Sequence, residues 1–140
     1  MSVNAPNDDI RSSIMPLNRA MPMNNLRASL MTWTRTHRLP ILIEYVLIPE
    51  VNDRAEHADQ LAAWIRDLPC RINLIPYNPR RNSPWPSPSD DLVDTFRTAL
   101  AGHGLSVNRR ITLGRSLMAA CGQLGSEEIR NRSRVKVNSP

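Results

Sequence analysis

The sequence is poor in the features that mark secreted and membrane proteins. Its 140 residues include only two cysteines, Cys70 and Cys121, which cannot build a disulfide framework and fit a reducing compartment. No apolar run approaches the roughly 20 residues needed to cross a membrane. The first residues also lack the charged and apolar regions of a signal peptide. These absences favour a cytoplasmic protein.

Lysine is almost missing as well. Lys136 is the only lysine, although lysine and arginine together number 18 and the formal net charge is +5. Because the arginine guanidinium suits phosphate geometry, this charge favours a polyanionic partner such as RNA. A GC-rich genome would also replace lysine with arginine, so composition alone leaves nucleic-acid binding open.

Helical and extended patterns alternate along the chain. Apolar spacing and capping residues predict helices near 7–15, 22–36, 53–68 and 89–101. Apolar runs rich in β-branched residues predict a strand end at Ser2–Asn4 and strands at 41–48, 72–77 and 105–113. This alternation predicts an α/β fold of parallel βαβ units. Because a small sheet would leave both edges open, we expect the chain to be part of a larger barrel or sheet.

Local signals add expectations within these elements. Asp53 and Glu56 have the spacing of a capping box at the start of the helix near 53–68. The histidines are expected on solvated helical positions rather than as metal ligands, because none has a suitably spaced partner; they are His37, His57 and His103. Cys70, at the amino end of a strand, is expected to be a core residue.

Ligands of parallel α/β proteins bind beyond the carboxyl ends of the strands. The candidate segments at that edge are Ser2–Asn4, Tyr77–Pro79 and Gly114–Gln123. The amide of Asn78 could recognise an amino acid or a base edge, although the local pattern favours an asparagine that stabilises its own turn. Cys121, between small residues and a glycine, is either an accessible nucleophile or a small buried cysteine.

Longer motifs occur in the same order in one protein family. They are Ser2–Asp8, Ile14–Asn18, Glu44–Leu47, Val51–Asp53, Pro69–Pro79 and Ala119–Leu124. Through them the chain resembles the carboxyl-terminal half of the radical S-adenosylmethionine (SAM) methyltransferases that methylate carbon 2 of an adenine in 23S ribosomal RNA and some tRNAs. The resemblance implies that residues 1–125 form about three βα units of a partial (β/α)6, TIM-like barrel. Residues 126–140 are expected to be a disordered basic tail.

The resemblance also implies roles for particular residues. Cys121 matches the cysteine that accepts a methyl group from one SAM. In the family, a radical made from a second SAM then abstracts hydrogen from that methyl group, and the resulting carbon radical adds to adenine. The positions that match SAM contacts are Ser2, Val3, Asn4 and Asn78. Asn4 stands where most members have histidine, an exchange that keeps hydrogen-bonding capacity.

Other departures bear on substrate choice and on activity. Arg80–Ser83 replaces a glycine-containing loop, and Gly114–Met118 replaces a more acidic stretch. The family's CxxxCxxC motif, which ligates a 4Fe–4S cluster, does not occur in the 140 residues, nor does the first half of the barrel. The resemblance therefore implies a fragment that is inactive by itself. The alternatives are a non-catalytic remnant that binds RNA or another polypeptide, and a half-barrel that does not fold stably alone.

Overall fold

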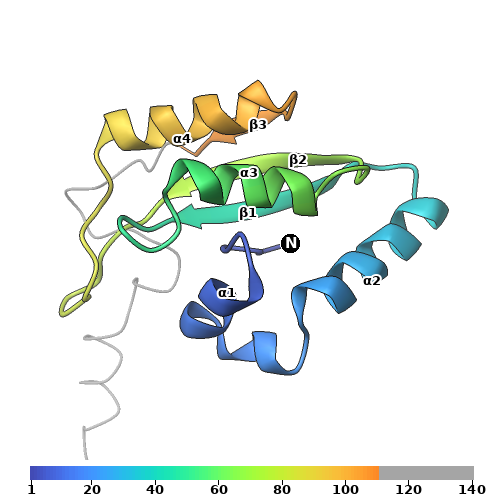
Figure 1. Ribbon diagram of the computed structural model, residues 1–140, viewed down its shortest axis with the longest axis horizontal. Helices are drawn as coiled ribbons and strands as arrows, with labels where there is room; N and C mark the ends of the chain where they lie inside the picture. Colours follow the sequence, from blue (N-terminus) through green and yellow to red (C-terminus); the bar gives the residue numbers. More distant parts are fainter. Residues whose placement is uncertain (111–140) are drawn as a thin grey trace, which may run out of the picture.

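A parallel three-stranded sheet forms the centre of the structure, a computed structural model that describes residues 1–110 (Figure 1). Its strands, in the spatial order β1-β2-β3, are β1 (Ile41–Leu47), β2 (Cys70–Pro76) and β3 (Val107–Arg109). Ile43 lies opposite Ile72, which in turn lies opposite Val107. The predicted α/β class with parallel strands is confirmed, and its place in a larger barrel stays a prediction.

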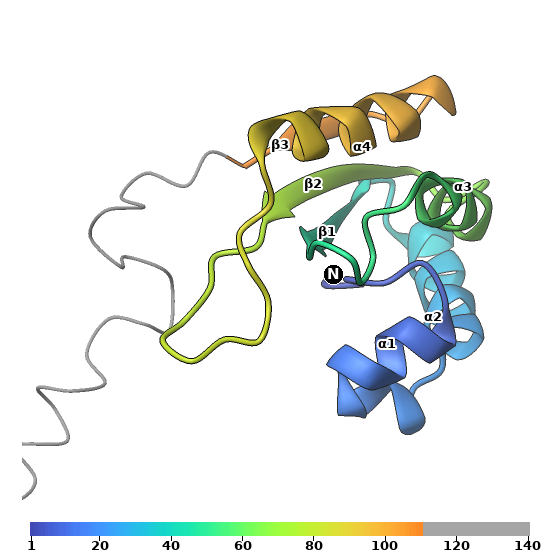
Figure 2. The ribbon, with the colours of Figure 1, turned by 60° about the vertical axis from the view of Figure 1, so that its left-hand side comes forward.

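Helices connect the strands on one side of this sheet. The elements are α1 (Asp8–Ile14), the 3-10 helix η1 (Pro16–Arg19), α2 (Met23–Thr36), α3 (Ala55–Trp64) and α4 (Asp90–Gly102). Figure 2 shows α2, α3 and α4 following one another around the sheet. Within α2, Arg27 Nε donates to the carbonyl oxygen of Trp64 at 2.7 Å, which joins this helix to the end of α3.

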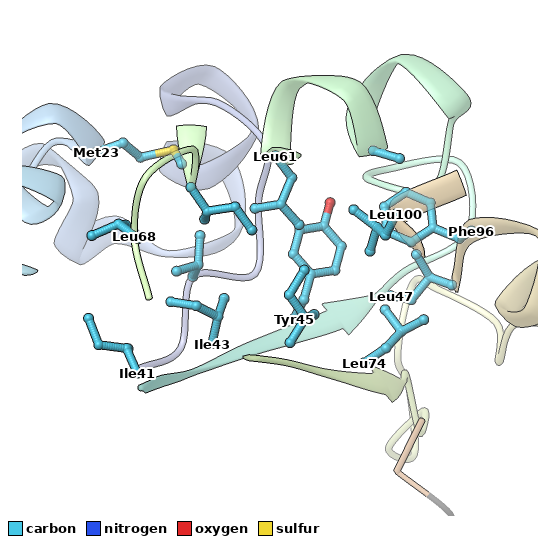
Figure 3. Close-up of a cluster of buried hydrophobic side chains, with 14 of the residues drawn as sticks. Met23, Ile41, Ile43, Tyr45, Leu47, Leu61, Leu68, Leu74, Phe96 and Leu100 are labelled. Atoms are coloured by element: carbon cyan, nitrogen blue, oxygen red, sulfur yellow. The ribbon is translucent and has the colours of Figure 1, made fainter. Parts of the chain in front are cut away.

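Alternate strand residues form the core with these helices (Figure 3). Those on β1 and β2 are Ile41, Ile43, Tyr45, Leu47, Ile72 and Leu74. The Tyr45 ring stacks on Phe96 of α4 with 5.4 Å between centroids. Because burying one large apolar side chain contributes about 1.5–3 kcal/mol, this face, called the covered face below, supplies most of the packing energy.

The intervening strand residues lie on the opposite face. Leu42 is 49% exposed, and Glu44 and Asn73 are half-buried. The register places Glu44, Asn73 and Asn108 opposite one another, so they form one polar row across the sheet. Among residues 1–110 no element buries this face, which we call the open face.

The amino-terminal segment extends the sheet beside β1. The Val3 N–H donates to the Glu44 carbonyl oxygen at 3.0 Å, and the Glu44 N–H donates to the Met1 carbonyl oxygen at 2.8 Å. Ser2 forms a parallel bridge with Glu44. The strand end expected at Ser2–Asn4 is therefore confirmed as a short parallel segment at the sheet edge.

The capping box expected from Asp53 and Glu56 is wrong. Helix α3 has Arg54 as its N-cap, and the Arg54 N–H donates to His57 Nδ1 at 3.2 Å. His57 is only 6% exposed, so its expected solvated position is also wrong. A ring nitrogen of histidine accepts a hydrogen bond as a carboxylate would, which allows the helix to begin later than the acidic residues suggest.

The other two histidines are exposed, as expected. The His37 ring stacks on Trp33 with 4.5 Å between centroids, and His103 Nε2 lies 2.7 Å from Asp59 Oδ1. Cys70, the first residue of β2, packs against the core, and burial raises the pKa of its thiol. This placement agrees with a structural role.

Some element boundaries differ from the expected ones. Helix α3 ends at Trp64, although Ile65 and Leu68 beyond it remain buried in turns. Strand β3 covers only Val107–Arg109 of the expected 105–113, and the last positions of that range lie outside the described residues. The expected domain boundary at residue 125 and the tail at 126–140 also lie outside them.

Candidate functional site at the carboxyl edge of the sheet

Two of the three candidate segments meet at the carboxyl edge of the sheet. Asn4 lies beside the end of β1, where its Oδ1 accepts from the Val46 N–H at 3.0 Å. Asn78 follows β2 directly, and the Tyr77 N–H before it donates to the Leu47 carbonyl oxygen at 3.1 Å. The third segment, which contains Cys121, lies outside the described residues.

A buried asparagine that we did not single out from the sequence holds this edge together. Asn52 is 0% exposed, and its Nδ2 donates to the carbonyl oxygens of Asn4 at 2.9 Å and Val46 at 2.8 Å. Its Oδ1 accepts from the Ile48 N–H at 2.7 Å. Tyr45 Oη donates to the Asn52 carbonyl oxygen at 2.7 Å, and burial raises the Tyr45 pKa so that the hydroxyl stays protonated. Asn52 therefore fixes Asn4 against the end of β1.

Asn4 has a backbone conformation that few residues adopt. Its φ is 57°, in the left-handed region, where asparagine is tolerated better than most side chains. Besides the bond to Val46, its Nδ2 lies 3.5 Å from Met15 Sδ. Both ends of this amide thus have contacts within the protein, so its main effect here is to turn the chain away from the sheet edge.

Val3 is a buried anchor. It is 0% exposed, and its carbonyl oxygen accepts from Arg11 Nε at 3.2 Å. Arg11 Nη1 also donates to Asn18 Oδ1 at 2.6 Å and to the Met21 carbonyl oxygen at 3.2 Å. Burial lowers the Arg11 pKa, while the Asp8 carboxylate opposes that shift. The arginine thereby ties the amino-terminal segment to α1 and η1, and a SAM contact by Val3 stays a prediction.

Ser2 and Asn78 offer the polar groups of this edge. Ser2 Oγ donates to Glu44 Oε2 at 3.0 Å, which leaves the lone pairs of the hydroxyl oxygen able to accept. The half-buried Asn78 side chain makes no hydrogen bond to any described residue, so the loop-stabilising role that the local pattern favours is not seen there. An amide in this position can pair with a nucleobase edge, and a hydroxyl can bind a ribose. These groups fit SAM.

The part of the chain that the structure describes holds no ligand set for an iron–sulfur cluster. Among the described residues, no group of three or more His, Cys, Asp or Glu side chains could hold a metal ion. Cys70 lies at the amino end of β2, opposite the candidate site, and Cys121 is the only other cysteine in the sequence. Within the same part of the chain, no helix has the length and apolarity to cross a membrane.

Comparison with known proteins shows which proteins the chain is similar to. The chain is 39% identical over 132 residues to the probable dual-specificity RNA methyltransferase RlmN 1 of Protochlamydia amoebophila, which covers 94% of this chain and 37% of the relative. It is 40% identical over 124 residues to the dual-specificity RNA methyltransferase RlmN of Bdellovibrio bacteriovorus, covering 89% and 31%. The chain is homologous to a segment of the RlmN methyltransferases.

Solved structures agree with this relationship. A radical SAM methyltransferase from Sphaerobacter thermophilus matches with a TM-score of 0.83 and 40% identity, over 87% of this chain and 36% of the other. A domain of pyruvate-formate lyase-activating enzyme from Bacteroides vulgatus shares the fold alone, with a TM-score of 0.61 and 18% identity. No family model matches the chain. The family resemblance expected from the sequence is confirmed, over a chain that spans 31–37% of these RlmN relatives.

Proposed function

We propose that this chain is part of a radical SAM enzyme that methylates carbon 2 of an adenine in 23S rRNA, tRNA or both. The observation that carries the proposal is the combined likeness to the Sphaerobacter methyltransferase, which has 40% identity and a TM-score of 0.83 over 87% of the chain. In this proposal the sheet is one portion of a partial (β/α)6 barrel. An RNA substrate would place the activity in the cytoplasm.

The carboxyl edge would hold the SAM molecule. Asn78 would pair with its base and Ser2 with a hydroxyl group, while Val3 and Asn4 would shape the edge through main-chain positions that Arg11 and Asn52 fix. When bound, SAM supplies the methyl group and, together with a reduced 4Fe–4S cluster, the radical that activates it.

Cys121 is the proposed methyl carrier. A thiolate is the nucleophilic form of cysteine. Its attack on the methyl group of SAM would form an S–CH3 bond on Cys121 while the S–CH3 bond of the donor breaks and S-adenosylhomocysteine leaves, which places the carbon to be transferred on this chain. Its neighbours in the sequence, Ala119, Ala120 and Gly122, all have small side chains, as an accessible thiol would need.

The cluster would be held elsewhere. Cys70 and Cys121 cannot provide three cysteine ligands. Cys70 also packs against the hydrophobic core, which does not suit a cluster ligand. We therefore propose that the 140 residues are inactive alone and need a polypeptide segment that carries the CxxxCxxC motif.

A chimaera tests the proposal directly. In it this chain replaces the homologous segment of the Bdellovibrio relative, and RNA from cells that lack their own enzyme is digested and analysed by mass spectrometry. We expect 2-methyladenosine with the natural residues and none with Cys121→Ala, whereas cluster absorbance should be the same in both. Full product from Cys121→Ala would exclude the methyl-carrier role. Absence of product from a chimaera whose absorbance shows an assembled cluster would exclude the proposed function.

The charge supports a second candidate, a non-catalytic remnant that binds RNA or docks on another polypeptide. The chain combines a net charge of +5 with the absence of a cluster motif. Such a remnant would give no methylated product in the chimaera. Its RNA affinity would still fall steeply with salt, as phosphate contacts require.

A further inference from the structure

The connection between β2 and α4 is a positively charged loop at the candidate site. Residues 77–89 contain two arginines, Arg80 and Arg81, and no acidic residue. Figure 2 shows this loop extending from the carboxyl end of β2 away from the helices, on the side of the molecule where β3 also ends. The loop therefore projects beyond the same edge that presents Asn78.

Internal contacts give the loop one shape. Tyr77 Oη and Ser83 Oγ are 2.7 Å apart, and the Trp85 N–H donates to Ser83 Oγ at 3.2 Å. The Trp85 ring meets Tyr77 edge-to-face, with 5.8 Å between centroids. The Ser83 N–H donates to the Arg80 carbonyl oxygen at 2.9 Å and closes a turn. Because the loop is already ordered, a ligand that binds it avoids much of the entropy cost of ordering.

Two arginines at this edge have no counter-charge among residues 1–110. The guanidinium groups of Arg80 and Arg110 are exposed and make no ion pair or hydrogen bond to any described residue. Arg109, by contrast, contacts Asp90 on the covered face and lies 3.5 Å from Asp94. The Arg110 N–H donates to the Leu74 carbonyl oxygen at 2.8 Å, which fixes its backbone beside the end of β2.

Acidic residues flank these arginines both after β1 and at the start of α4, where Asp90 and Asp91 directly follow the loop. Glu50 and Asp53 are in the connection after β1, whereas Arg80 and Arg110 follow β2 and β3. At the start of α4, Asp90 is already in contact with Arg109. On the β2 and β3 side, four arginines (Arg80, Arg81, Arg109 and Arg110) stand against Asp90, Asp91 and Asp94, a formal charge of +1, next to the half-buried Trp85.

We propose that Arg80, Arg110 and Trp85 form a binding surface for single-stranded RNA that flanks the target adenine. This inference rests on the proposed function and adds to it the surface by which the substrate is held. Guanidinium groups bind phosphates, and a base stacks on an aromatic ring only where it is unstacked from its own helix. A loop or bulge of RNA therefore fits this surface better than a continuous duplex.

Fluorescence anisotropy with a labelled RNA hairpin, whose loop contains an unpaired adenosine, tests the surface in the full chain. We expect the Arg80→Ala/Arg110→Ala double variant to bind about tenfold more weakly, and the slope of log affinity against log salt to fall by about 0.7 for each arginine removed. Arg80→Lys should retain more affinity than Arg80→Ala. Binding should quench the emission of Trp85, and Trp85→Phe should remove that quenching.

Matched controls lie at the opposite edge of the sheet. Arg38 precedes β1 and Arg71 is the second residue of β2, and both are exposed. Arg38→Ala/Arg71→Ala removes the same charge as the double variant above and should change affinity much less. The basic tail is present in every variant, so its contribution cancels in this comparison.

The outcomes separate this inference from the proposed function. An equal loss in the two double variants, an unchanged affinity without Arg80 and Arg110, or no RNA binding by the natural chain would each overturn the surface. In the chimaera, the same double variant should raise KM for RNA while Cys121-dependent methylation persists at saturating RNA. Normal KM in that variant would overturn the surface and leave the function standing, whereas absence of product from the natural residues would overturn the function itself.

Discussion

On β1, Ile43 and Tyr45 are 0% exposed, whereas Leu42, between Ile41 and Ile43 in sequence, is 49% exposed. The same alternation continues on β2, where Ile72 and Leu74 are buried and Asn73 between them is only half-buried. The covered face is apolar because helices pack on it, and the open face keeps the polar row of Glu44, Asn73 and Asn108. One face of each strand therefore stabilises the fold, while no element within residues 1–110 covers the other face.

The largest effect on stability is expected when a side chain on the covered face is shortened, compared with a side chain on the open face. Ile43→Ala should lower the free energy of unfolding by about 2–5 kcal/mol, because it removes buried methyl groups and leaves a cavity. Leu42→Ala, one position away, should change it by about 0.5 kcal/mol or less, as for other exposed positions. Urea denaturation of the isolated chain measures both values.

The same experiment examines whether the segment folds alone. A cooperative urea transition in the natural chain would count against a half-barrel that is unstable by itself. Similar losses in Ile43→Ala and Leu42→Ala would contradict the distinction between the faces, since it would mean that the open face is buried in solution.

A smaller effect is expected at Asn52, which joins the buried strand end to the candidate site. Asn52→Ala leaves the Ile48 N–H and the Asn4 carbonyl without their partners, and we expect a loss of about 1–3 kcal/mol. Asn52→Asp keeps an acceptor for Ile48 but places a carboxylate against the Asn4 and Val46 carbonyl oxygens, so it should not restore stability.

Hydrogen exchange locates that change. The Ile48 amide should exchange faster in Asn52→Ala, while amides in the middle of β2 should change much less. Asn24→Ala, at an exposed position of α2, is the matched control and should leave both unchanged. Unaltered protection of Ile48 would show that Asn52 does not fix this edge.

Asn52 also illustrates what the sequence could and could not predict. Apolar runs rich in β-branched residues identified β1 and β2, and the rule for parallel sheets correctly placed Ser2–Asn4 and Asn78 at one edge. The contact from Asn52 to Asn4 spans 48 residues, so no local pattern contains it. The available signal was a polar residue directly after a buried strand, in the Val51–Asp53 motif, which local reasoning treats as a loop.

The predicted start of α3 was wrong for a related reason. Asp53 and Glu56 satisfy the usual capping pattern, but the described helix uses Arg54 and the ring of His57 instead. Which polar side chain becomes buried depends on how the helix packs on the sheet, and sequence spacing does not specify that. The same limit applies to Val3, whose side chain and main-chain groups are all used internally.

The smallest predicted effect concerns His57 and depends on pH. Burial lowers the His57 pKa below its ordinary value of 6.5, with Glu56 opposing the shift. The unfolded state then binds more protons than the folded state at acidic pH, so this contribution to stability is complete above about pH 6.5 and declines as the pH falls toward the folded-state pKa. His57→Asn, which keeps a neutral acceptor, should flatten the dependence between about pH 5 and about pH 7 in urea denaturation, whereas His37→Asn, at an exposed position, should not. If the natural chain and His57→Asn lost equal stability over that range, burial would not be lowering the pKa of the His57 side chain.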